Sequence, residues 1–148
     1  MKNRIDLPEG EILRRLNAMC PGTLMETFGI EYTEAGEKSL SCRMTVGDNM
    51  MRPGGIVHGG ATMALIETVG SSASLLFMDP EKEVVLGIDV SANHVSTGRK
   101  GDVLTATAKA IHIGRSTQLW QVKVVNQDGR LISHGKVTNI VMPKEVLG

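Results

Sequence analysis

The alternation of apolar and polar residues predicts a short helix, two strands, one long helix and four further strands. Apolar side chains recur at helical spacing in residues 8–19, and Pro21-Gly22 ends that pattern. Two strand-like runs follow at Ile30–Thr33 and Leu40–Val46. A loop rich in glycine and polar residues then occupies residues 47–57.

The segment over residues 59–77, GGATMALIETVGSSASLLF, is the predicted long helix. Apart from Ser and Thr it contains one polar side chain, Glu67. A helix that is apolar on nearly all sides is a buried helix. Its length also raises the possibility of a membrane span. We exclude a span because of the central Glu, the many small polar residues and the strand patterns that follow directly.

Four strand-like stretches rich in Thr, Val and Ile complete the chain. They cover Val84–Ser96, Val103–Ile113, Thr117–Asn126 and Leu131–Val141. Turns at Gly98–Gly101, Gly114-Arg115 and Asp128-Gly129 predict that successive strands are antiparallel neighbours. A curved antiparallel sheet would cover most of the apolar helix, and a second subunit would cover the rest. The expected class is therefore α+β.

Length and charge narrow the class of protein. The 148 residues fit one domain over residues 1–148. A net charge of zero argues against a nucleic-acid partner. The charged start, Met1 to Gly10, has no apolar run behind it, so we expect no signal peptide. Two cysteines form neither a disulfide framework nor a metal motif, which favours a reduced cytoplasm and no metal.

Glu67 is the residue that the buried-helix prediction does not explain. An ionised carboxylate buried without partners costs several kcal/mol even after relaxation. A structural carboxylate held by hydrogen bonds and a catalytic acid, base or nucleophile both remain open at this point. There is no G-x-S-x-G elbow or Walker loop to support a serine hydrolase or a nucleotide hydrolase.

The stretch before the helix, Pro53-Gly54-Gly55-Ile56-Val57-His58-Gly59-Gly60, offers a site for a carbonyl oxygen. The first N–H groups of a helix have no intrahelical partner, and the macrodipole adds roughly half a positive charge there. Such an end can hold an oxyanion during acyl transfer. A glycine-rich turn that only permits tight packing is the alternative.

Spacing constrains how these groups can act together. His58 and Glu67 are nine positions apart, or roughly 13 Å along a helix axis. A Glu side chain cannot reach a carbonyl docked at the start of its own helix. We therefore expect a homodimer in which antiparallel helices bring Glu67 of one copy beside Gly59 of the other, giving two shared sites.

The motifs as a set resemble those of the hotdog-fold acyl-CoA thioesterases. They are the run His58-Gly59-Gly60-Ala61, then Glu67, then Gly70-Ser71, followed by Asn93-His94-Val95, Gly101, His112-Ile113-Gly114-Arg115 and Trp120-Gln121. The resemblance runs from about residue 10 to residue 141 and is greatest to small bacterial enzymes of the phenylacetate-degradation and 1,4-dihydroxy-2-naphthoyl-CoA hydrolase types. It implies a six-stranded antiparallel sheet around one long helix, in dimers and often homotetramers.

The resemblance also implies roles for the catalytic groups. Glu67 resembles the carboxylate that attacks the thioester carbon or activates water, and the Gly59 N–H resembles the group that polarises the carbonyl. His58 resembles the residue that orients the site, and Ser71 the hydroxyl that positions water or the carboxylate. No cofactor is implied, because CoA is part of the substrate.

Further positions match contacts with the nucleotide and pantetheine of CoA in the family. They are His94, Arg99, Gly114, Arg115 and Ser116, with Gly60 beside the carbonyl site. Arg52 departs from the family, which usually has Gln or Asn six residues before the histidine. Arginine is always charged and accepts no hydrogen bond, so Arg52 would bind an acidic acyl group or a CoA phosphate, or point outward.

These observations favour an acyl-CoA thioester hydrolase, with aryl-CoA esters as the expected substrates. Two alternatives remain: a hotdog hydratase or dehydratase, and a non-catalytic acyl-CoA-binding hotdog protein. The hydratase places its His and carboxylate in other motifs. A DNA-binding regulator is disfavoured because the residues before the first strand are too few and too weakly basic for a helix-turn-helix.

Overall fold

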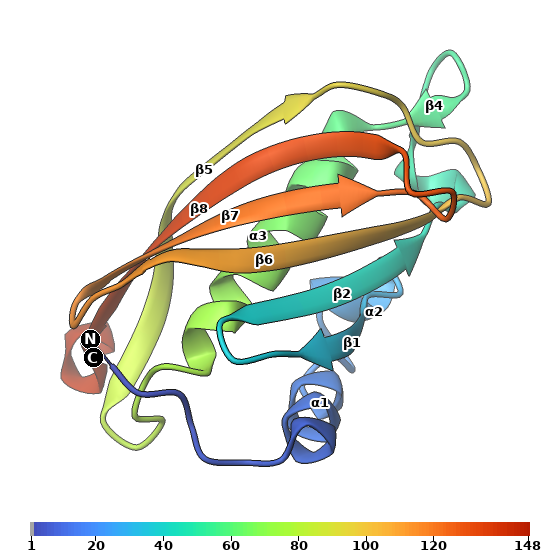
Figure 1. Ribbon diagram of the computed structural model, residues 1–148. Helices are drawn as coiled ribbons and strands as arrows, with labels where there is room; N and C mark the ends of the chain where they lie inside the picture. Colours follow the sequence, from blue (N-terminus) through green and yellow to red (C-terminus); the bar gives the residue numbers. More distant parts are fainter. Residues whose placement is uncertain (1) are drawn as a thin grey trace.

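A six-stranded antiparallel sheet curves around one long helix, α3 (Gly59–Leu75), in the computed structural model, which describes residues 2–148 (Figure 1). This is the hotdog arrangement expected from the sequence. The strands of the sheet are β1 (Glu31–Ala35), β2 (Ser39–Thr45), β5 (Glu83–His94), β6 (Val103–Ile113), β7 (Thr117–Val125) and β8 (Leu131–Pro143).

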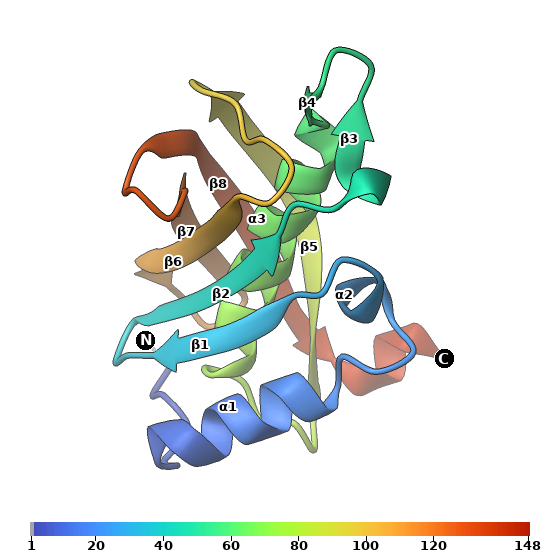
Figure 2. The same cartoon turned by 90° about the vertical axis from the view of Figure 1, so that its right-hand side faces the viewer.

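Smaller elements flank this framework. The predicted first helix is α1 (Glu9–Ala18), which lies below β1 at the edge of the sheet (Figure 2) and whose Ile12 and Leu16 are buried. Two elements were not predicted. No element was expected at α2 (Leu24–Thr27), and the hairpin of β3 (Met51–Arg52) and β4 (Ile56–Val57) lies within the predicted loop over residues 47–57. Short 3-10 turns, η1 (Asp48–Met50) and η2 (Lys144–Leu147), complete the elements.

The sheet order is β1-β2-β6-β7-β8-β5, which corrects one expectation. The turn at Gly98–Gly101 does not join neighbouring strands, because β5 pairs with β8 along its whole length, from Glu83↔Pro143 to His94↔Ser133. Residues 95–102 instead cross from β5 to β6 past the start of α3, where the N–H of Val57 donates to the carbonyl of Gly98. The β6–β7 and β7–β8 turns are hairpins, as predicted.

The core lies between the concave face of the sheet and α3. The inward face of β7 carries Trp120, Val122 and Val124, all with no exposed surface. Each such side chain contributes about 1.5–3 kcal/mol through removal from water. The helix lies close to β8 at Gly70, where a Cβ would stand 2.6 Å from Val137 Cγ2. A larger residue at Gly70 would therefore push the helix away from the sheet.

One face of α3 remains open in the single chain, which is the part of the helix that a second subunit was expected to cover. Glu67 is exposed, and Met63, Ala64, Thr68 and Ser71 are only half-buried. The sheet cannot close over this face because β5 is its last strand. No helix within residues 2–148 is long and apolar enough to cross a bilayer.

Candidate functional site

The start of α3 carries a free backbone donor. His58 is the N-cap residue, and its Nδ1 accepts the N–H of Gly60 at 2.8 Å. The neutral imidazole of His58 therefore carries its proton on Nε2. Within residues 2–148 the N–H of Gly59 has no acceptor. The capping geometry thus leaves one N–H at the positive end of the helix dipole available to a ligand.

His94, at the end of β5, faces this donor. A Cβ on Gly59 would stand 3.1 Å from His94 Nε2, so glycine is what allows the imidazole to approach the helix start. His94 Nδ1 lies 3.0 Å from Ser133 Oγ, and that hydroxyl donates its single proton to the carbonyl of Asn93 at 3.1 Å. The Nδ1 must then be the donor, which leaves Nε2 of neutral His94 as an acceptor directed at Gly59.

A cleft of about 160 Å³ opens at this point. Gly59, His94 and Arg52 line it, together with Ile56, Val57, Thr62, Ser96, Thr97 and Ile132. None of these residues is acidic. In the part of the chain that the structure describes, the exposed Arg52 side chain has neither an ion-pair nor a hydrogen-bond partner. The cleft therefore presents positive charge beside the free N–H of Gly59.

Glu67 and Ser71 lie one turn apart on the open face of α3, next to β5. A Cβ on Gly87 would stand 3.1 Å from Glu67 Oε1, 3.4 Å from Ser71 Oγ and 3.6 Å from Asn139 Oδ1. Gly87 precedes an irregularity in which Ile88 is skipped in the β5–β8 register. In the described chain the carboxylate of Glu67 has no hydrogen-bond or ion-pair partner.

The single chain does not bring the two groups together. Gly59 and Glu67 are eight residues apart on one straight helix, or roughly 12 Å. The expected CoA contacts are divided as well. His94 and Arg99 lie at the α3 start. Gly114, Arg115 and Ser116 form the turn at the far end of β6, which is about 35 Å away when the length of the strand is taken from its rise per residue.

Two residues in the Glu67 cluster were missed, although the sequence carried a signal for each. A glycine inside a predicted strand, such as Gly87, indicates a bulge or a close approach. Asn139 occupies an inward position between Val137 and Val141 on β8 and is fully buried. A polar residue in such a position needs hydrogen-bond partners inside the protein.

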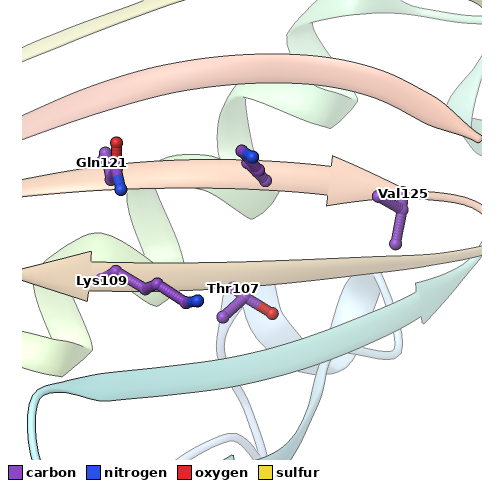
Figure 3. Close-up of a pocket in the computed structure, with 5 residues that line it drawn as sticks. Thr107, Lys109, Gln121 and Val125 are labelled. Carbon is purple, nitrogen blue, oxygen red and sulfur yellow. The ribbon is translucent and has the colours of Figure 1, made fainter. Parts of the chain in front are cut away.

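A second hollow lies on the outer face of the sheet. Figure 3 shows Thr107 and Lys109 of β6 beside Gln121 and Val125 of β7. Together with Lys123 these residues line a space of about 270 Å³. The sheet separates this hollow from α3. None of the residues that line it is acidic, so the candidate site is the one on α3.

Comparisons with known proteins agree with this geometry. The sequence pattern of the thioesterase superfamily matches residues 54–133, which include the α3 start, Glu67 and His94. The 1,4-dihydroxy-2-naphthoyl-CoA hydrolase of Escherichia coli is 34% identical over 88% of this chain and 94% of its own. A crystal structure of a Pseudomonas aeruginosa thioesterase variant superposes with a TM-score of 0.88, at 33% identity, over 95% of this chain and 98% of that one.

Two structures of a Staphylococcus aureus relative are of variants with a single substitution to alanine. Its structures are 36% identical to this chain, cover 82% and 81% of it and 99% and 98% of their own, and have TM-scores of 0.79 and 0.78. They carry alanine in place of a glutamate and of a glutamine fifteen positions apart. Glu67 and Arg52 are also fifteen positions apart.

The family match over residues 54–133 and the identity to the Escherichia coli hydrolase show the family. This chain belongs to the thioesterase superfamily and is a thioester hydrolase with a hotdog fold.

Proposed function

We propose that this protein hydrolyses acyl-CoA thioesters, with aryl-CoA esters as the preferred class, and that Glu67 and the N–H of Gly59 perform the reaction. The supporting observation is that α3 carries a backbone donor at its start and a carboxylate near its middle, neither of which has a partner among the described residues. These are the groups that hydrolysis of an ester requires: one that polarises the carbonyl and one that activates the attacking group.

The thioester carbonyl would enter the cleft at the α3 start and accept the N–H of Gly59. This donor is part of the backbone, so it is fixed before the substrate arrives and stabilises the oxyanion as charge develops. Gly60, whose N–H is already bound to His58, holds the capping histidine in place. His58 is thus an orienting residue, and Glu67 acts as base or nucleophile.

The separation along α3 supports a site shared between two copies of the chain. The free edge of β5 exposes Leu86 and Ile88, the latter at 59%, beside the open face of α3. Exposed apolar side chains next to an open helix face favour association. We propose that a second copy packs here with its α3 antiparallel, which would bring the partner's Glu67 to the carbonyl held by Gly59.

The basic side chains would bind the CoA part of the substrate, which carries phosphates. Arg52 lines the cleft at the carbonyl site, where His94 offers an acceptor nitrogen and no charge, and Arg99 lies in the loop beyond it. Arg115, with Gly114 and Ser116, lies at the far end of the sheet, where it would serve a CoA bound mainly by the partner. Phosphates need such cations.

The test is an assay of free thiol release from aryl, short-chain, medium-chain and dicarboxylyl CoA esters, run in parallel with Glu67→Gln. We expect hydrolysis of at least one ester and a loss of about 10²–10⁴ in kcat for Glu67→Gln. Binding of CoA esters without turnover would overturn the proposal and favour a binding protein. Hydration of an unsaturated acyl-CoA without thiol release would favour the hydratase reading.

A further inference from the structure

Asn139 joins the buried core to the open face of α3. Its Nδ2 donates to the carbonyl of Gly70 at 3.0 Å and to Ser74 Oγ at 2.7 Å, and the same Ser74 Oγ accepts Nε1–H of Trp120 at 2.8 Å. Its Oδ1 accepts the hydroxyl of Ser71 at 3.3 Å. Asn139 and Trp120 have no exposed surface, so the amide is held on both sides by buried groups.

These bonds fix which way the amide faces. The carbonyl of Gly70 can only accept, so the amide group facing it must be Nδ2. The oxygen Oδ1 then faces Ser71. Because Oδ1 can only accept, the single proton of Ser71 is directed toward Asn139. The lone pairs of Ser71 Oγ are therefore left to face Gly87 and Glu67.

We infer that Asn139 is a positioning residue that makes Ser71 a hydrogen-bond acceptor in the active site. This inference rests on the proposed thioester hydrolysis with Glu67 as the base. An acceptor beside a carboxylate is suited to a water molecule, which has two protons to donate, one to Ser71 and one to Glu67. Were the Ser71 proton free, it would bond to the carboxylate and weaken Glu67 as a base.

The arrangement favours the route through water over direct attack by the carboxylate. The oxygen of the held water forms the new C–O bond while one of its protons passes to Glu67. The C–S bond then breaks and its electron pair leaves on sulfur. The proton on Glu67 passes to the thiolate, which gives the free acid and CoA thiol.

Two variants and a matched control test the inference. Asn139→Asp keeps the shape but places a second carboxylate beside Glu67, which disfavours ionisation of the pair. We expect the acid limb of the kcat/KM pH profile to move up by about one pH unit. Asn126→Asp is the control: Asn126 is a buried amide in the β7–β8 turn, where Oδ1 only accepts the N–H groups of Asp128 and Arg130. Its profile is expected to match wild type.

The other charged groups near α3 affect the pH profiles of Asn139→Asp and Asn126→Asp equally. β5 and β8, the strands beside Glu67, carry the titratable side chains Glu83, Asp89, His94, His134 and Lys136. β2, β6 and β7 pack on other faces of α3, and their Arg43, Lys109, His112 and Lys123 are exposed. Since neither variant changes these groups, a shift confined to Asn139→Asp identifies the pair Glu67–Asn139.

A double-mutant cycle provides the second measurement and does not need a buried charge to fold. Asn139→Thr, a residue that strands accept well, removes the amide. We expect kcat to fall about tenfold with KM unchanged, and no further fall when Asn139→Thr is combined with Ser71→Ala, because both act through one group. Additive losses and an unshifted Asn139→Asp profile would overturn the inference. If Glu67→Gln retains activity, the proposed function itself fails instead.

Discussion

The carboxylate of Glu67 lies against the bare α-carbon of Gly87: a methyl group on Gly87 would stand 3.1 Å from Oε1. The two residues come from different elements, α3 and β5, and meet just before the irregularity in β5. The absence of a side chain at Gly87 thus decides where the carboxylate can lie.

Gly87→Ala should therefore lower activity without lowering stability. The methyl group would displace Oε1 by a few tenths of an ångström, and small misplacements of a reacting group are costly, so we expect kcat to fall about tenfold. Stability should rise slightly or stay level, because alanine restricts the unfolded chain by about 0.4–1 kcal/mol. Steady-state kinetics and urea unfolding measure the two effects.

Gly10→Ala is the matched control for this substitution. Gly10 is in α1, and a Cβ there meets no atom within 4 Å. It should show the stability gain with wild-type kcat. A Gly87→Ala protein with full kcat would show that Glu67 does not need its observed place.

The proposed sharing of each site between two copies of the chain predicts that two inactive variants restore activity when mixed. Glu67→Gln removes the carboxylate, and Gly59→Val places a side chain against His94 at the carbonyl site. Co-refolding equal amounts gives heterodimers with one intact site each, so about a quarter of wild-type activity should return. Refolding each variant alone is the control. Activity that never returns would mean that each site belongs to one chain.

Arg52 should determine preference for the charge of the acyl group. If its guanidinium binds a carboxylate of the substrate, Arg52→Gln will lower kcat/KM for dicarboxylyl esters about tenfold relative to neutral aryl esters. Arg43→Gln, which removes an exposed cation paired with Glu31 on another part of the sheet, is the control and should leave this ratio unchanged. An equal loss for every ester would instead place a CoA phosphate on Arg52.

Stability should fall at alkaline pH because of Cys42. Burial, together with the neighbouring Cys20, raises the pKa of the Cys42 thiol from 9.0 to about 12. The unfolded chain loses this proton first, so the contribution to stability is complete below pH 9 and is lost as pH rises toward 12, at up to about 1.4 kcal/mol per unit. Tyr32, whose pKa burial also raises, adds to the loss above pH 10.

Urea unfolding at pH 8 and pH 10.5 checks this, with Cys42→Ala for comparison. The alanine variant will be less stable at pH 8, because it leaves a cavity in the core. Its free energy of unfolding should nevertheless fall less between the two pH values. Equal falls for both proteins would contradict the assignment to Cys42.

Local patterns in the sequence determined the elements and much of the chemistry. Helical spacing predicted α1, and the apolar run predicted α3 from its first residue, Gly59. The run rich in Thr, Val and Ile predicted β6 with its observed bounds, Val103–Ile113. These features follow from neighbours along the chain, since the periods of helices and strands are set by local backbone geometry.

The tertiary structure alone decided which strands pair and what surrounds Glu67. A turn signal such as Gly98–Gly101 does not distinguish a hairpin from a crossover, because pairing of β5 with β8 depends on edges that are far apart in sequence. The open face of α3 follows from β5 being the last strand of the sheet. Asn139 and Gly87 reach Glu67 across about 72 and 20 residues of chain, and only the folded register of β5 and β8 on α3 brings them there.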